Sequence, residues 1–284
     1  MNIIDLFAGC GGLSSGFANN NFKSCGFLDW DNSSIETLKA NYINKNLNSD
    51  NFLKADIRTV NLKKNVNIIK FINNLNQADI DGIIGGPPCQ AYSLAGRSSD
   101  PNNMKNDYRN YLFESYITFL KHFKPKFFIF ENVLGLLSAK PKKKYIKEII
   151  SEAFNQVGYD IPKIDNNIVF NFSDFGIPQN RKRLIIFGVN KSIKKESILL
   201  IKKFFTSLNN FRKKKSNVKK AIGNLDKIYP IKNYTHRVSH ISYSKDPLHF
   251  PRFHNQRDIK IFKILAKDSA SKNPIYNNVD KIKE

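Results

Sequence analysis

A single cysteine stands in an unusually stiff loop. Residues 85–93 read Gly-Gly-Pro-Pro-Cys-Gln-Ala-Tyr-Ser and follow the apolar pair Ile83 and Ile84. The glycines let the backbone bend tightly or approach a ligand, and the prolines fix φ and hold the next residue extended. A thiolate is a good nucleophile towards an electron-poor carbon when its surroundings lower the cysteine pKa. The pattern favours Cys89 as a nucleophile over the buried structural cysteine that is the commoner alternative.

Acidic residues end three further segments that the sequence predicts as strands. Asp29, Asp56 and Glu131 each follow an apolar run, and segments of helical period separate these runs. This alternation is typical of an α/β fold with a parallel sheet. Open parallel sheets bind ligands beyond the carboxyl ends of their strands. We therefore expect the three carboxylates to converge with Cys89 on one edge of the sheet.

The N-terminus has the order of a cofactor-binding unit. Residues 2–7 predict a buried strand, residues 8–12 form a glycine-rich loop, and a helix is predicted to begin near Leu13. Glycines let a backbone come close to a ligand, and the start of a helix offers unpaired N–H groups. The loop is not a dinucleotide fingerprint, because Ser14 stands where the third glycine would be. A plain tight turn between strand and helix is the alternative.

The second predicted strand ends with an acid and the only tryptophan. Asp29 comes about 20 residues after the glycine loop, where an acid grips ribose hydroxyls in α/β nucleotide sites. Trp30 could lie along a purine ring, and packing in the core is an equal alternative.

Two arginines lie between the last two predicted strands, 167–171 and 184–189. If the second of these strands runs antiparallel to the rest of the sheet, its first residues lie at the same edge as the acids. Arg181 and Arg183 would then face the site. A solvated basic turn is the alternative interpretation.

The composition favours a polyanionic partner. The 284 residues contain 46 Lys and Arg against 24 Asp and Glu, a formal charge of +22, and nucleic acid is the first candidate. Lysine richness also follows from an AT-rich genome, so the charge is supporting evidence only. Three cysteines without C-x-x-C pairing and scattered histidines suggest neither disulfides nor a metal site. Without an apolar span or a signal segment, we expect a cytoplasmic protein that does not contact a membrane and associates with the nucleoid through DNA.

Together these segments resemble the C5-cytosine DNA methyltransferases. The resemblance runs in order from residue 2 to about residue 189, and its motifs include the stretch Pro87–Gln90 that carries the cysteine. The other matching motifs are Asp5-Leu6-Phe7-Ala8-Gly9-x-Gly11-Gly12, Asp29-Trp30-Asp31, Asp56-Ile57, Asp107-x-Arg109-Asn110-x-Leu112-Phe113, Glu131-Asn132-Val133 and Gln179-Asn180-Arg181-x-Arg183.

The resemblance implies a fold, a domain organisation and a donor. The fold would be a Rossmann-like S-adenosylmethionine-dependent methyltransferase sheet with helices on both faces, followed by a partial smaller target-recognition domain. Residues 1–190 would form the catalytic domain, and residues 191–284 the basic, partial target-recognition region. The methyl donor would be S-adenosylmethionine, with no metal.

The resemblance also implies a reaction and its residues. A methyl group would pass to C5 of a cytosine flipped out of duplex DNA, through a covalent Cys89 adduct, in a restriction-modification system. The implied catalytic residues are Cys89, Glu131, Arg181 and Arg183. The implied cofactor-binding residues are Asp5, Phe7, Ala8, Gly9, Gly11, Gly12, Leu13, Asp29, Trp30, Asp56, Ile57, Pro88 and Leu112.

The resemblance weakens after residue 190. The two motifs that family members normally carry near their C-terminus, one of which packs beside the cofactor loop, have no counterpart in these 284 residues. A second polypeptide that supplies them is therefore an expected partner. The alternatives are an inactive fragment that still binds DNA and an RNA cytosine-5 methyltransferase on the same scaffold.

Overall fold

The computed structural model describes most of the chain as two compact units, residues 1–216 and residues 217–284. The described residues are 1–18, 20–42, 47–60, 66–76, 78–88, 111–140, 144–193, 196–231, 239–245, 249, 253–269 and 271.

The first unit contains one mixed sheet with strand order β3-β2-β1-β4-β5-β8-β6, and β7 also pairs with β8. Strands β1 to β5 are parallel, and β8 runs antiparallel to β5. The prediction of a mainly parallel sheet is confirmed, and the condition set for the arginine motif, a last strand antiparallel to the rest, is met by β8. The bounds are β1 (Asn2–Leu6), β2 (Lys23–Asp29), β3 (Phe52–Lys54), β4 (Ile80–Gly85), β5 (Phe127–Val133), β6 (Tyr159–Asp160), β7 (Val169–Asn171) and β8 (Lys182–Asn190).

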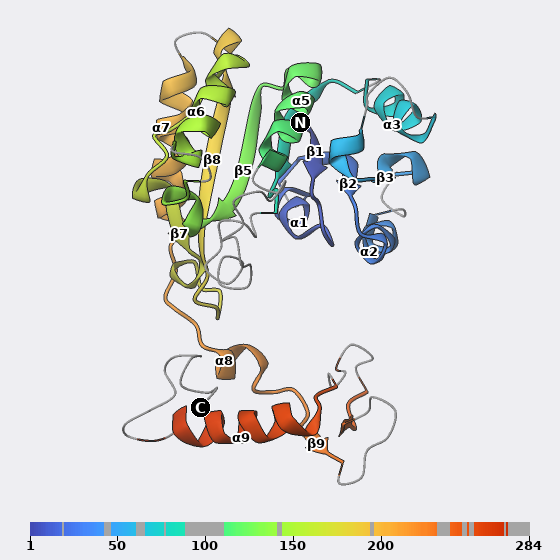
Figure 1. The fold of residues 1–284 in the computed structure, drawn as a ribbon, viewed down its shortest axis with the longest axis vertical. Helices are drawn as coiled ribbons and strands as arrows, with labels where there is room; N and C mark the ends of the chain where they lie inside the picture. Colours follow the sequence, from blue (N-terminus) through green and yellow to red (C-terminus); the bar gives the residue numbers. More distant parts are fainter. Residues whose placement is uncertain are drawn as a thin grey trace. The chain divides into compact units, whose positions relative to one another are not determined.

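Helices cover both faces of this sheet (Figure 1). Helices α3, α5 and α6 pack on one face in the main apolar core, whereas α1, α2 and α7 contribute to two smaller clusters. Strands buried on both faces need almost continuous apolar sequences, which explains why the parallel strands were recognisable as short apolar runs. The bounds are α1 (Gly12–Ala18), α2 (Asn32–Tyr42), α3 (Val66–Asn76), α5 (Leu112–Phe123), α6 (Ile146–Gln156) and α7 (Glu196–Asn210).

A buried tyrosine joins the α5 layer to the centre of the sheet. The Tyr116 hydroxyl lies 2.8 Å from the carbonyl oxygen of Ile83 on β4 and 3.1 Å from that of Ile129 on β5. Its ring meets Phe130 edge to face, with centroids 5.4 Å apart. These contacts hold β4 and β5 in place next to each other, just before the segments that follow them at the carboxyl edge of the sheet.

The described residues of the second unit form one longer helix and several short elements, and few of their side chains are buried. Its described elements are α8 (Val218–Ile222), the antiparallel pair β9 (Ile228–Pro230) and β10 (His240–Ser242), and α9 (Gln256–Ser269). The compact units divide after Ser216 because α7 packs on β8. The functional division at residue 190 stays a prediction. No helix within the described residues is both long and apolar enough to cross a membrane.

Candidate active site

The register of the sheet brings the ends of four parallel strands together. Leu6 of β1 pairs with Leu28 of β2 and with Gly85 of β4, and Gly85 in turn pairs with Phe130 of β5. The segments that follow these residues leave the same edge. They are the glycine loop 7–12, Asp29 with Trp30, the start of the cysteine loop at 86–88, and Glu131.

Unusual backbone conformations shape the glycine loop. Gly9 and Gly11 have φ of +54° and +84°, and Phe7 has φ of +60°, a region that non-glycine residues rarely adopt. A Cβ added at Gly9 or Gly12 would meet nothing within 4 Å. The backbone of the loop is therefore open on one side, as the approach of a ligand requires. Of the other predicted residues in this stretch, Ala8 is buried and Leu13 packs against the small core cluster.

The end of β2 presents an aromatic ring to solvent. Trp30 is 75% exposed, so the core-packing alternative was wrong. Asp29 is almost fully buried, and its two carboxylate oxygens accept hydrogen bonds from the backbone N–H groups of Gly9 at 2.8 Å and Asp31 at 2.9 Å. In this structure Asp29 holds the glycine loop against β2. Contact of Asp29 with a ribose stays a prediction.

Asp56 lies after β3 and is already partnered. Its carboxylate accepts from the Arg58 guanidinium, with Nε 2.9 Å from Oδ1, and from the Arg58 backbone N–H at 3.0 Å. These hydrogen bonds hold the pKa of Asp56 below its usual value. The next predicted residue, Ile57, is buried. About a third of the Asp56 side chain (34%) is exposed to solvent and therefore open to a ligand.

Asp5 is a carboxylic acid inside the core below the glycine loop. Its side chain is 1% exposed and accepts a hydrogen bond from the hydroxyl of Ser14, which is fully buried. Burial raises the pKa of Asp5 to about 7, against the lowering effect of the Ser14 hydrogen bond. This contact joins the end of β1 to α1 across the loop. The predicted role of Asp5 in cofactor binding is untested, and its visible role is to shape the loop.

Replacing Asp5 with asparagine is expected to remove a pH dependence of stability. Because the folded-state pKa is raised from 3.8 to about 7, the wild type is most stable relative to the variant below pH 4. It loses up to about 4 kcal/mol of unfolding free energy as the pH rises from about 4 to 7. Urea unfolding of Asp5→Asn across this range should show a flatter profile, whereas the exposed-site control Asp50→Asn should follow the wild type. Parallel profiles for wild type and Asp5→Asn would contradict the raised pKa.

Glu131 and the start of the cysteine loop are in close contact. A Cβ on Gly86 would lie 2.9 Å from Oε2 of Glu131, so only glycine leaves room for the carboxylate there. The Asn132 amide donates to the Pro87 carbonyl oxygen at 3.4 Å. Two neighbouring contacts thus fix the direction in which the loop leaves β4.

An arginine balances the buried acid. Arg183 Nε lies 2.9 Å from Oε1 of Glu131, and both side chains are mostly buried. Burial raises the pKa of Glu131, while Arg183 and Arg181 act in the opposite direction. Because β8 is antiparallel to β5, Arg183 pairs with Val133 at the carboxyl edge. Arg183 therefore contacts Glu131 at this edge, whereas Arg181 is exposed, and the catalytic roles of both arginines stay predictions.

Cys89 lies outside the described residues, as does the rest of 89–110, and two predicted residues lie on either side of this segment. Pro88 is exposed, and Leu112 is buried at the start of α5. The chain therefore leaves β4 beside Glu131 and returns at α5. The position of the Cys89 thiol stays a prediction.

Comparison with known proteins assigns the family. The family model for C-5 cytosine-specific DNA methylase matches residues 1–282. The chain belongs to this methylase family. Curated relatives are type II methyltransferases: M.DdeI of Desulfomicrobium norvegicum is 40% identical over 190 residues, 66% of this chain and 40% of that protein. M.Bpa9945I of Bacillus paralicheniformis is 35% identical over 247 residues, 69% of this chain and 55% of that protein.

A solved structure supports the fold of this methylase family member. A crystal structure described as a candidate DNA modification methyltransferase encoded within an E. coli prophage matches with a TM-score of 0.59 and 29% identity. The match covers 87% of this chain and 61% of that one. The chain spans about half the length of the curated relatives it matches.

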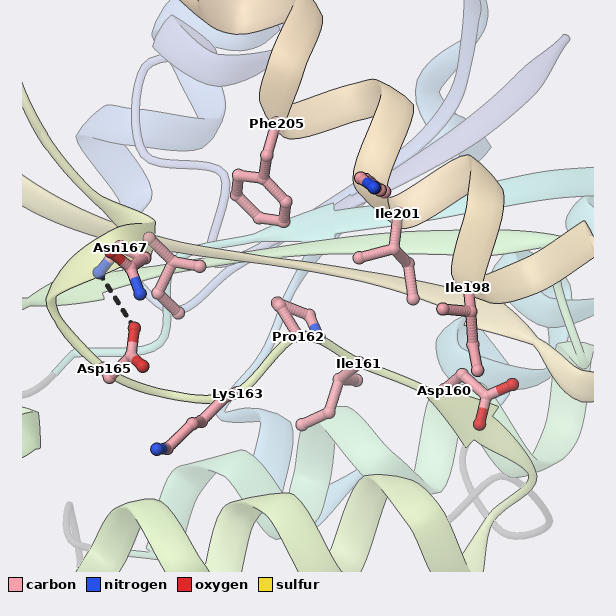
Figure 2. Close-up of a pocket in the computed structure, with 11 residues that line it drawn as sticks. Asp160, Ile161, Pro162, Lys163, Asp165, Asn167, Ile198, Ile201 and Phe205 are labelled. Carbon is pink, nitrogen blue, oxygen red and sulfur yellow. Dashed lines mark hydrogen bonds between the residues drawn. The ribbon is translucent and has the colours of Figure 1, made fainter.

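A cavity in the first unit lies apart from the predicted site. It has a volume of about 460 Å³ and lies between α7 and the segment 160–168 (Figure 2). Ile161, Pro162, Ile201 and Phe205 give it an apolar lining. None of the sequence-predicted site residues lines it.

Several positions in the candidate site were not recognised as functional from the sequence. Ser14 was noted only as an interruption of a glycine pattern, yet it is the partner of Asp5. Gly86 was assigned to loop flexibility, yet its missing Cβ makes room for Glu131. A pairing across 45 residues of sequence, such as Gly86 with Glu131, has no signal in a single sequence.

Proposed function

We propose that this chain is the catalytic part of a DNA (cytosine-5-)-methyltransferase of a restriction-modification system, acting on duplex DNA in the cytoplasm. The observation that carries the proposal is the mostly buried Glu131, held by Arg183 at 2.9 Å and in contact with the base of the cysteine loop at Gly86. An acid whose pKa is raised by burial is suited to donate a hydrogen bond to a ring nitrogen.

The residues present fit S-adenosylmethionine as the donor. The open backbone at Gly9 and Gly12 leaves room for a ligand, and the exposed Trp30 offers a flat apolar surface for an adenine ring. Asp29, at the rim of the same loop, would face the ribose. When bound, the donor supplies an electrophilic methyl group on a sulfonium.

The reaction follows from the residue types at the edge. The target cytosine leaves the duplex, since its C6 is out of reach inside the base stack. The Cys89 thiolate adds to C6 while Glu131 donates to N3, and the electrons of the C5–C6 double bond form an enamine. C5 then forms a bond to the methyl group, and the donor leaves as the neutral thioether. Loss of the C5 proton to a base, departure of the thiolate from C6 and return of the N3 proton to Glu131 restore the C5–C6 double bond and the neutral ring.

The first experiment measures transfer of tritiated methyl groups from S-adenosylmethionine to unmethylated duplex DNA, with nucleoside analysis of the product. The expected product is 5-methylcytosine. Transfer RNA is tested in parallel. Labelling of RNA alone would favour the RNA enzyme, and DNA binding without labelling would favour an inactive fragment.

We also propose that a further polypeptide segment, supplied by a second chain or a longer form of this one, completes the sheet face on the α1 side. Partly exposed aromatic residues support this: Phe17, Phe127 and Phe187 pack only in part against the small cluster. Exposed apolar residues also lie on α7, with Ile198 71% exposed. Co-expression with the product of the neighbouring reading frame should then raise methyl transfer, and that product should copurify with the chain. Unchanged activity and no copurification would argue against the proposal.

Replacing Gly86 with alanine is expected to lower methyl transfer without unfolding the protein. The new Cβ would displace the Glu131 carboxylate from 2.9 Å, which is inexpensive for the fold because a side-chain end can move. A loss of about 10- to 100-fold in kcat is expected if Glu131 acts as an acid. Gly16→Ala on α1 is the control, since a Cβ there meets nothing within 4 Å. Equal turnover by both variants would show that Glu131 needs no fixed position.

A further inference from the structure

The basic segment 211–216, which follows α7, is attached to the turn before the arginine motif. The backbone N–H of Lys213 donates to the Asp174 carbonyl oxygen at 2.8 Å, and Lys213 forms a parallel bridge with Phe175. The Arg212 guanidinium lies 3.0 Å from the Asp174 carboxylate and 5.8 Å from the centre of the Phe175 ring. A run of like charges in a sequence usually forms a solvated, unattached segment. In segment 211–216, these contacts hold the backbone in a defined position.

The same turn positions the arginine motif. The backbone N–H of Phe172 donates to the Arg181 carbonyl oxygen at 2.9 Å, and the Asn171 amide donates to the Asn180 side-chain oxygen at 2.8 Å. Gly176, with φ of +83°, lets the basic segment come close: a Cβ there would lie 3.4 Å from the Cβ of Lys213. A continuous set of contacts therefore joins Lys213 to the strand that carries Arg183.

The charges on this surface are largely unbalanced. Asp174 is the acid in contact with the basic segment, and Arg212 and Lys215 already pair with it. Within the described part of the chain, Lys182, Lys213 and Lys214 form no ion pair, and all three are exposed. Several ordered and unpaired cations beside one catalytic edge match the repeating phosphates of a nucleic acid backbone better than a single small anion.

We propose that Arg181, Lys182, Lys213 and Lys214 form a phosphate-binding cluster that holds the backbone of duplex DNA beside the base pocket. The cluster positions DNA and reads no sequence, because phosphate contacts are the same at every base pair. It also gives the segment that leads into the second unit a direct role in substrate binding. The proposal rests on the proposed function, since the ligand is the substrate of that site.

The test compares Lys213→Gln/Lys214→Gln with the wild type in binding to a fluorescein-labelled unmethylated duplex between about 50 and 200 mM salt. Removing two phosphate contacts should make the slope of log K against log salt shallower by about 1.8, because each contact contributes about 0.9. Duplexes of unrelated sequence should lose affinity equally, and binding of S-adenosylmethionine should not change.

The control is Lys23→Gln/Lys121→Gln, which removes the same charge from exposed residues at the opposite edge of the sheet, at the start of β2 and the end of α5. This control should keep the wild-type slope. If the wild type binds duplex and both double variants match its slope, the phosphate-binding cluster is wrong and the proposed function stands. If the wild type binds no duplex, both are wrong.

Discussion

Replacing Cys89 with serine is expected to abolish methyl transfer while leaving the binding of DNA and of S-adenosylmethionine intact. A serine hydroxyl is almost fully protonated at neutral pH and is a much weaker nucleophile than a thiolate. The expected loss is at least about 1,000-fold, since addition to C6 is required before C5 can react. Labelled methyl transfer to duplex DNA measures it, and filter binding tests that the variant still holds the duplex.

A covalent trap identifies the thiol directly. In a duplex with 5-fluorocytosine at the target, the fluorine at C5 cannot leave as a cation, so the adduct persists after methyl transfer. The wild type and Cys10→Ser should both form a denaturant-stable complex in the presence of S-adenosylmethionine, and Cys89→Ser should not. Cys10 is the informative control because it is an exposed thiol in the glycine loop. A stable complex with Cys89→Ser would contradict the assignment of the nucleophile.

Replacing Glu131 with glutamine is expected to lower kcat by about 100- to 10,000-fold, the range that a positioned general acid contributes. Glutamine has nearly the same shape and can still accept from Arg183, so the fold and the loop at Gly86 should persist. It cannot transfer a proton to N3, so the negative charge that develops on the ring when the thiolate adds to C6 is not neutralised. Single-turnover methyl transfer separates this loss from any change in product release.

The pH profile distinguishes an acid from a merely structural carboxylate. Burial raises the pKa of Glu131, and the protonated form is the active one, so the wild-type rate should fall as the pH rises through this pKa. The rate of the glutamine variant should be lower throughout and should not fall as the pH rises. Asp174→Asn is the control for a partly exposed acid with basic partners outside the base pocket. A pH profile for Glu131→Gln parallel to the wild type would exclude Glu131 as the acid.

The sequence by itself determined the main elements and the edge where they meet. Apolar runs such as 127–130 on β5 and the glycine loop after β1 are local patterns that backbone preferences and burial impose within a few residues. Because the carboxyl ends of neighbouring parallel strands lie at one edge, a list of residues that follow strands was enough to bring Asp29 and Glu131 together.

Tertiary structure alone decided which of these side chains reach the surface and what they contact. Trp30, just after β2, is exposed, and Asp5, inside β1, is buried, although both lie near the carboxyl ends of apolar strands. The contacts of Gly86 with Glu131 and of Arg212 with Asp174 join residues that are dozens of positions apart. Such contacts depend on sheet register and on the packing of whole elements, and these arise from summed long-range interactions that no local spacing records.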